Sequence, residues 1–199
     1  MIGSHDAPRI AGRVGEAQAR VAAMLLLTLR GTPTLYQGDE LGIGTVAIAP
    51  AQVRDPRELR QPGRGLGRDP SRTPMPWDGS PQAGFTTATE AWLPLNDDWP
   101  TRNVAAQDAD PGSMLSLYRA LLKFRRGSEA LTLGSLTLVD AAEGVLAYER
   151  RHGDERLGVA LNLTTEARPL PFAGTSLLST LNGTGEGGLR PDEGVVLAL

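Results

Sequence analysis

The chain has 199 residues, a formal net charge of −3 at pH 7 and no cysteine. This length allows one or two compact domains, and the slightly acidic balance excludes the basic field that nucleic acids or anionic membranes require. The longest apolar run, residues 21–29, is far too short to span a bilayer. Without cysteine there is no disulfide or thiolate chemistry. A cysteine-free chain suits a reducing compartment, so we expect a cytoplasmic protein that binds neither nucleic acid nor membrane.

The first residues form a short apolar stretch that ends in His5 and Asp6. Gly3 and Ser4 make a small-residue corner, and Pro8 prevents continuation as a helix or central strand. The pattern predicts a strand end with an imidazole and a carboxylate at its carboxyl tip. In a (β/α) barrel such residues face the active-site mouth, whereas the alternative is a loop pair or a helix cap.

Residues 16–30 predict a buried helix that ends at Gly31. Residues 32–36 predict a short buried strand, which leads into an acidic loop with Asp39 and Glu40. These two acids are candidates for catalysis. They are also candidates for structural roles, as caps or as partners of arginines, and the residue pattern favours the structural roles.

Residues 43–112 form a long loop region that contains two Arg-Asp-Pro turns, at 54–57 and 68–72, and a Pro-rich turn at 73–79. Arginine, aspartate and tryptophan together suit a sugar site, because aromatic faces stack on pyranose rings and guanidinium groups bind hydroxyls. The alternative is a solvated loop whose arginines lie in water.

Residues 114–126 predict a second helix, with Ser113 as its N-cap and Gly127 after its end. Basic residues in its last turn, including Arg125, would complement the C-terminal end of the same helix. The expected apolar face comprises residues 114, 117, 118, 121 and 122.

From residue 128 the apolar residues alternate, as is typical of β-strands. We expect a small antiparallel sandwich with a hairpin turn at residues 152–155, in which His152 is exposed. Because the chain has two histidines and no cysteine, it contains no metal-ligand cluster, and we expect neither metal nor cofactor. The expected strands cover residues 131–139, 145–151, 157–164, 167–172, 177–181 and 195–199.

Five segments, in chain order, resemble the C-terminal part of α-glucosidases in the α-amylase superfamily. The resemblance is to the branch that includes oligo-1,6-glucosidases, bacterial α-glucosidases and sucrose isomerases. The segments are IGSHDAPRIAGRVG (2–15), GTPTLYQGDELG (31–42), GRDPSRTPMPWDGSPQAGFT (67–86), WLPLN (92–96) and LYRALLKFRR (117–126).

The resemblance implies the C-terminal part of a (β/α)₈ TIM barrel followed by a β-domain. Residues 1–127 would be the remnant of the catalytic barrel, comprising the end of strand 7, helix 7, strand 8, a long loop and helix 8. Residues 128–199 would be the small antiparallel β-sandwich domain.

The resemblance also implies roles for three residues. By motif, Asp6 matches the family's third carboxylate, which stabilises the transition state by binding sugar hydroxyls. His5 matches a histidine that hydrogen-bonds the same glucose, and Arg68 matches an arginine that reaches the glucose at the non-reducing end. Ser4 stands where the family motif has Asn, a change that keeps a polar side chain at the corner.

The family's nucleophile Asp and proton-donor Glu belong to motifs on earlier strands, and nothing in the 199 residues matches those motifs. We therefore expect the C-terminal fragment of an α-glucosidase, which when complete cleaves short α-glucosides with retention of configuration. The missing N-terminal half of the barrel is a candidate partner. Two alternatives stay open: a fragment of a transglycosylase of the sucrose isomerase or trehalose synthase type, and a non-catalytic carbohydrate-binding or interaction module.

Overall fold

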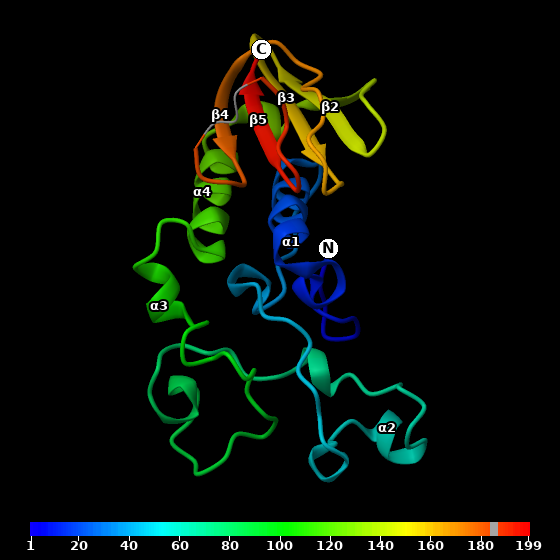
Figure 1. The fold of residues 1–199 in the computed structure, drawn as a ribbon, viewed down its shortest axis with the longest axis vertical. Helices are drawn as coiled ribbons and strands as arrows, with labels where there is room; N and C mark the ends of the chain where they lie inside the picture. Colours follow the sequence, from blue (N-terminus) through cyan, green and yellow to red (C-terminus); the bar gives the residue numbers. More distant parts are fainter. Residues whose placement is uncertain (184–186) are drawn as a thin grey trace. The chain divides into compact units, whose positions relative to one another are not determined.

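The computed structural model describes residues 1–183 and 187–199, and its ribbon is shown in Figure 1. The chain divides into two compact units, which are described separately below. Unit 1 comprises residues 1–15 and 34–116, and unit 2 comprises residues 16–33 and 117–199. In the described part of the chain, no helix is both long and apolar enough to cross a membrane.

Unit 1 consists of long loops joined by short helical turns (Figure 1). Its small core contains Leu41, Ile43 and Leu115, against which Met75 and Val104 pack. The helical elements are the first part of α1 (Ile10–Thr28), the 3-10 turns Asp39–Leu41, Pro50–Gln52, Asp69–Ser71 and Pro81–Gly84, the helices α2 (Pro56–Arg60) and α3 (Val104–Asp108), and the first turn of α4 (Met114–Arg126).

The two strands predicted near the N-terminus and at residues 32–36 do not form. A single β-bridge joins Ser4 and Ala7, and residues 32–36 lie outside any strand. The physical reason is that a strand requires a paired neighbour for its backbone groups. Among the described residues, no neighbouring strand pairs with either segment.

The helix predicted at residues 16–30 is present but differs at both ends. α1 starts at Ile10 and ends at Thr28, and Gly15 interrupts it with φ 79° and ψ 166°. A left-handed φ of this kind suits glycine, because a side chain there would be strained. The predicted helix therefore corresponds to the part of α1 that follows Gly15.

Unit 2 contains one five-stranded antiparallel sheet rather than the predicted sandwich, with strand order β1-β2-β3-β5-β4. The predicted hairpin is confirmed, since His152 pairs with Glu155. The predicted strand at 131–139 starts later, because Ser128 caps the short helix α5 (Glu129–Thr132) through the backbone N–H of Leu131. The strands are β1 (Ser135–Val139), β2 (Val145–His152), β3 (Glu155–Asn162), β4 (Thr175–Ser179) and β5 (Gly194–Ala198).

The predicted strand at 167–172 is also wrong, and the residues that the structure describes form no second sheet. Arg168 makes one bridge, to Leu189. Pro169 and Pro171 lack backbone N–H groups and cannot extend the pairing. The segment covers the sheet instead: Leu170 and Phe172 pack on a buried cluster formed by Ala160, Leu189, Val195 and Leu197.

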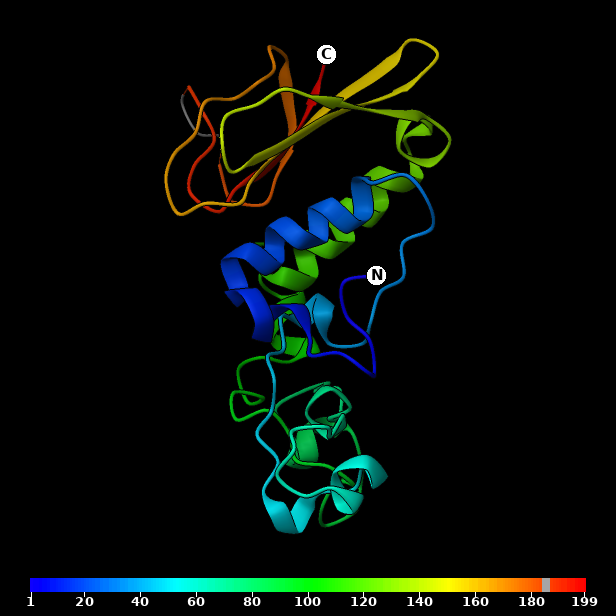
Figure 2. The ribbon, with the colours of Figure 1, turned by 90° about the vertical axis from the view of Figure 1, so that its right-hand side faces the viewer.

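The helices α1 and α4 lie on the other face of the sheet (Figure 2). Two buried arginines donate hydrogen bonds to backbone carbonyls at the C-terminal end of α1. Arg125 donates to the carbonyls of Leu27 and Leu29 at 2.8 and 3.0 Å. Arg150 donates to the carbonyl of Thr28. The last carbonyls of a helix have no partner within the helix, and cations stabilise that end. Arg125 thus complements α1, not its own helix as predicted.

We expect replacement of Arg150 by Met to destabilise unit 2 by about 3 kcal/mol. The guanidinium also donates to the carbonyls of Ser135, Leu131 and Gly134, and these buried acceptors would lose their donor. Urea unfolding followed by far-UV circular dichroism measures the change. Arg151→Met, at the exposed neighbouring position of the same strand, is the control and should change stability little.

Candidate functional site

The carboxylate of Asp6 lies on a tight turn of unit 1. The backbone N–H of Asp6 donates to the hydroxyl of Ser4 at 3.2 Å, and the N–H of Ala7 donates to the carbonyl of Ser4 at 3.3 Å. Ser4 therefore forms a side-chain hydrogen bond at this turn, as we expected from the sequence. The side chain of Asp6 is 51% exposed, so one side of the carboxylate remains open to a ligand.

Two arginines hold the Oδ1 atom of Asp6. Nη1 of Arg68 and Nη2 of Arg72 each lie 3.1 Å from it. Nε2 of His5 lies 3.3 Å from the other carboxylate oxygen, Oδ2. Arg72 also donates through Nε to the carbonyl of His5 at 2.9 Å. The structure thus brings the three predicted site residues together and adds Arg72, which the sequence reasoning did not assign.

Asp55 is a second residue that the sequence reasoning missed. Its side chain is fully buried and binds the Arg68 guanidinium with both oxygens, at 2.6 Å to Nε and 3.0 Å to Nη2. It also accepts the backbone N–H of Arg68 at 2.8 Å. Such a two-point pair fixes the plane of the guanidinium. Arg68 therefore reaches Asp6 with its remaining Nη1.

The two Arg-Asp-Pro turns create this arrangement. Asp55 caps α2 by accepting the N–H of Arg57 at 3.0 Å, and Pro56 occupies the first helical position. Asp69, in the second turn, accepts the N–H groups of Arg54 and Asp55 at 2.6 and 2.8 Å. The sequence shows the repeated Arg-Asp-Pro tripeptide. It does not show that Asp55 of the first copy pairs with Arg68 of the second, 13 residues later.

Arg9 ties the segment of Asp6 to that of Arg72. Its side chain is completely buried, and it donates to the hydroxyl of Thr73 at 2.7 Å, to the carbonyl of Thr73 at 3.0 Å and to the carbonyl of Gln37 at 3.2 Å. Because Arg9 follows Asp6 by three residues and Thr73 follows Arg72 directly, these bonds keep the carboxylate beside the arginines.

The charges of the site favour an ionised Asp6. The hydrogen bond from Arg68, helped by the nearby charges of His5 and Arg72, holds the pKa of Asp6 below its ordinary value. Hydrogen bonding by the same guanidinium holds the pKa of Asp55 far below its ordinary value. An ionised carboxylate that stays half exposed can accept hydrogen bonds from the hydroxyl groups of a ligand.

Asp39 and Glu40 have structural contacts, as the residue pattern favoured. Asp39 is buried, its Oδ1 accepts the N–H of Ile10 at the start of α1, and its Oδ2 has no hydrogen-bond partner among the described residues. Burial raises the pKa of Asp39 to about 6. Glu40 accepts the N–H of Gly38 at 2.7 Å.

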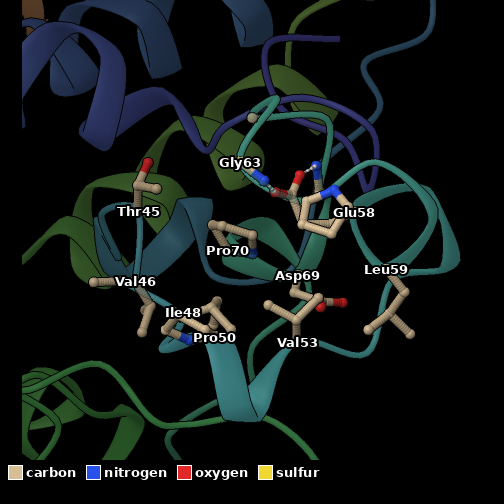
Figure 3. A pocket seen from close by; sticks show the side chains of 14 residues that line it. Thr45, Val46, Ile48, Pro50, Val53, Glu58, Leu59, Gly63, Asp69 and Pro70 are labelled. Atoms are coloured by element: carbon tan, nitrogen blue, oxygen red, sulfur yellow. Dashed lines mark hydrogen bonds between the residues drawn. The ribbon is translucent and has the colours of Figure 1, made fainter.

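Unit 1 contains a pocket of about 550 Å³. It is lined mainly by aliphatic side chains, among them Ile48, Val53 and Leu59 (Figure 3). Its carboxylate groups are already engaged. Glu58 accepts three backbone N–H groups, from residues 63, 66 and 67, and Asp69 accepts two. Because a sugar site needs available polar groups, this pocket suits a sugar poorly. No group of three or more metal-binding side chains occurs in the described part of the chain.

Comparison with known proteins shows the family. Residues 1–134 match the model of the α-amylase catalytic domain, and the chain belongs to the α-amylase family. It is 38% identical over 152 residues to a probable α-glucosidase of Rhizobium meliloti, a match that covers 76% of this chain and 27% of that protein. It is 36% identical over 194 residues to a glucan 1,6-α-glucosidase of Streptococcus pneumoniae, covering 86% of this chain and 36% of that protein.

Among solved structures, the trehalulose synthase MutB of Pseudomonas mesoacidophila is similar to this chain. The TM-score is 0.85 at 31% sequence identity, and the match covers 98% of this chain and 42% of that one. The chain thus spans 27% to 36% of the two curated relatives. The family resemblance carried by the five sequence segments is confirmed.

We expect Arg68→Gln to raise the pKa of Asp6 toward its ordinary value, because the strongest donor to that carboxylate is lost. A ¹³C NMR titration of the Asp6 carboxyl measures the pKa. Arg64→Gln, an exposed arginine in the same loop, should leave the pKa unchanged. An unchanged Asp6 pKa in folded Arg68→Gln would contradict the geometry.

We expect Asp39→Asn to flatten the dependence of stability on pH between about pH 4 and 6. In this window the folded chain keeps a proton that the unfolded chain has released, so stability falls as pH rises. The resulting penalty at neutral pH is on the order of 3 kcal/mol. Urea unfolding at several pH values tests this expectation, with Asp97→Asn, an exposed carboxylate of the same unit, as the control. An equally steep dependence in Asp39→Asn would exclude Asp39 as its source.

Proposed function

We propose that this chain supplies part of the active site of an α-glucosidase-type glycoside hydrolase in carbohydrate metabolism, acting on short α-glucosides. The observation that carries the proposal is the half-exposed Asp6 carboxylate held by Arg68 and Arg72, with His5 beside it, in a chain of the α-amylase family. Residues 1–127 would belong to the catalytic barrel and residues 128–199 to the C-terminal β-domain. The absence of cysteine supports a cytoplasmic location.

In this proposal Asp6 acts as the transition-state stabiliser, and His5 and Arg68 bind the glucose. Retaining cleavage passes through an oxocarbenium-like state, so an ionised carboxylate near the ring lowers the energy of the positive charge. The guanidinium groups keep the Asp6 carboxylate ionised and aimed. The nucleophile and the proton donor would come from the other strands of the barrel, either in the same protein or in a partner chain.

A transglycosylase is a second candidate, and the similarity to a trehalulose synthase structure favours it. Both reactions use the same carboxylate chemistry and differ in whether water or a sugar accepts the glucosyl group. A non-catalytic carbohydrate-binding module is a third candidate. It predicts saccharide binding by the chain without any turnover.

A chimera tests the proposal. The matching C-terminal segment of the Rhizobium meliloti relative is replaced by residues 1–199 of this chain, and hydrolysis of maltose and isomaltose is measured. We expect activity in the chimera and a loss of at least about 100-fold in kcat/KM in Asp6→Asn. Asp97→Asn, an exposed carboxylate of the same unit, is the control and should retain activity.

Three results separate the candidates. Conversion of sucrose into isomers with little glucose release would favour the transglycosylase. A folded chimera that binds maltose without turning over any substrate would favour the binding module. Full activity in Asp6→Asn would remove Asp6 from the mechanism.

A further inference from the structure

The turn formed by Asn182 and Gly183 in unit 2 carries a side-chain amide next to an unobstructed backbone nitrogen. Both residues are exposed, in the connection between β4 and β5. Gly183 has a φ of 75°, a left-handed value that suits glycine. Apart from its chain neighbours, no described residue has an atom within 4 Å of the point where a Cβ on Gly183 would stand. A ring therefore has room to close at this peptide group.

An asparagine followed by glycine can react with its own backbone. The glycine nitrogen loses its proton to solvent and attacks the side-chain carbon Cγ of the asparagine. The bond from Cγ to the amide nitrogen breaks, ammonia leaves with a proton taken from water, and a five-membered succinimide ring remains. Glycine permits the attack because it has no side chain in the way. The step neither oxidises nor reduces the chain.

Both reacting groups of this turn are available. Neither the backbone N–H of Gly183 nor the side-chain amide of Asn182 donates to another described residue. Asn162, in the same unit, shows the opposite arrangement. Its completely buried amide donates to two backbone carbonyls at 2.7 and 2.8 Å, and the N–H of Leu163 donates to the carbonyl of Gly144 at 2.9 Å. Asn162 is therefore protected from the same reaction.

The guanidinium of Arg190 contacts the two carbonyl oxygens of the turn. Its Nη1 donates to the carbonyl of Asn182 at 3.0 Å, and its Nη2 donates to that of Gly183 at 2.8 Å. The carbonyl of Asn182 and the N–H of Gly183 belong to one peptide group. When the nitrogen loses its proton, the negative charge spreads onto the oxygen that Arg190 holds. A fixed cation at that oxygen favours the charged form and so promotes formation of the nucleophile.

Glu193 keeps Arg190 at the turn. Its side chain is buried, and Oε1 accepts from Nη2 of Arg190 at 2.7 Å while Oε2 accepts the backbone N–H of Arg190 at 2.8 Å. The hydroxyl of Ser179 donates to the same Oε1 at 2.6 Å. The hydrogen bond to Glu193 raises the pKa of Arg190 above its ordinary value, so the guanidinium stays charged. The cation is thus in place before any reaction begins.

We propose that Asn182 is a site of spontaneous modification, which Arg190 directs toward isoaspartate. Water opens the succinimide by adding to one of its two carbonyl carbons. Addition at the backbone carbonyl of Asn182 breaks the bond from that carbon to the nitrogen of Gly183. The chain then runs through Cγ, and the former backbone carbonyl becomes a carboxylate with release of one proton. Arg190 polarises this same carbonyl, favours addition there and pairs with the new carboxylate.

The test incubates the full chain at neutral pH and follows each asparagine by mass spectrometry of proteolytic peptides. Loss of ammonia identifies the succinimide, and chromatography of the product peptides separates isoaspartate from aspartate. We expect conversion at Asn182 with isoaspartate as the main product, while Asn162 stays intact. If Asn182 stays intact in the folded chain while the urea-unfolded chain converts there, the proposal is wrong.

The variant Arg190→Gln tests the role of the guanidinium. We expect it to slow the conversion of Asn182 by about tenfold and to lower the ratio of isoaspartate to aspartate. Arg156→Gln removes an exposed arginine of the same unit and should keep the wild-type rate and ratio. In urea all three chains should react at one rate, because the effect requires the folded contact.

A second variant covers the case in which Arg190→Gln fails to fold because Glu193 is left buried without its cation. The double variant Arg190→Gln/Glu193→Gln removes both charges, and circular dichroism of the sheet reports its folding. It should show the same slower reaction. Faster conversion in either folded variant would mean that Arg190 protects the turn, and an unchanged rate and product ratio would mean that it plays no part. Each of these results would overturn the proposal.

Discussion

The buried guanidinium of Arg9 is the constraint on which the site depends. Burying a cation is costly unless its N–H groups find acceptors, and each of the three guanidinium nitrogens of Arg9 donates one hydrogen bond: Nε to the Gln37 carbonyl, Nη1 to the Thr73 hydroxyl and Nη2 to the Thr73 carbonyl. Gln37 and Thr73 are far apart in sequence, and neither lies in a regular helix or strand. Unit 1 consists mainly of loops, so the hydrogen bonds of one buried arginine join segments that strand pairing would join in a sheet.

The charged side chains near Arg9 contact one another in series. Asp69 holds the backbone of Asp55, Asp55 holds the guanidinium of Arg68, and Arg68 reaches Asp6. Arg72 approaches the same Asp6 oxygen from its own turn. The carboxylate at the end of this chain is ionised and oriented before any ligand arrives, which is the property that electrostatic stabilisation of a transition state requires.

The same use of arginine recurs in unit 2, where Arg125 and Arg150 bind carbonyls at the end of α1. In both units buried guanidinium groups satisfy backbone acceptors that regular secondary structure leaves open. The sequence does not indicate which arginines are buried in this way. A buried arginine and a solvated one cannot be told apart from sequence when their hydrogen-bond partners are distant in the chain.

Local signals in the sequence predicted local structure well. The apolar spacing and the flanking Ser113 and Gly127 correctly indicated α4, and the 152–155 turn indicated the β2–β3 hairpin. The strand predicted at 167–172 failed because alternation alone ignores the two prolines that block pairing. The motif singled out Asp6, His5 and Arg68, which the structure places side by side. Asp55 and Arg72 could not be predicted, since their contacts with these residues span 13 and 66 residues of the chain.

The pKa of Asp6 in the variant Arg9→Met tests the central claim most directly. Arg9 is not among the groups that shift the pKa of Asp6, so any effect of the substitution must pass through the position of the arginine-bearing segment. If Arg9 keeps that segment in place, the pKa of Asp6 rises toward its ordinary value while the circular dichroism of the sheet is unchanged. A depressed pKa that persists in folded Arg9→Met would show that the carboxylate and its arginines assemble without Arg9, and would contradict the account.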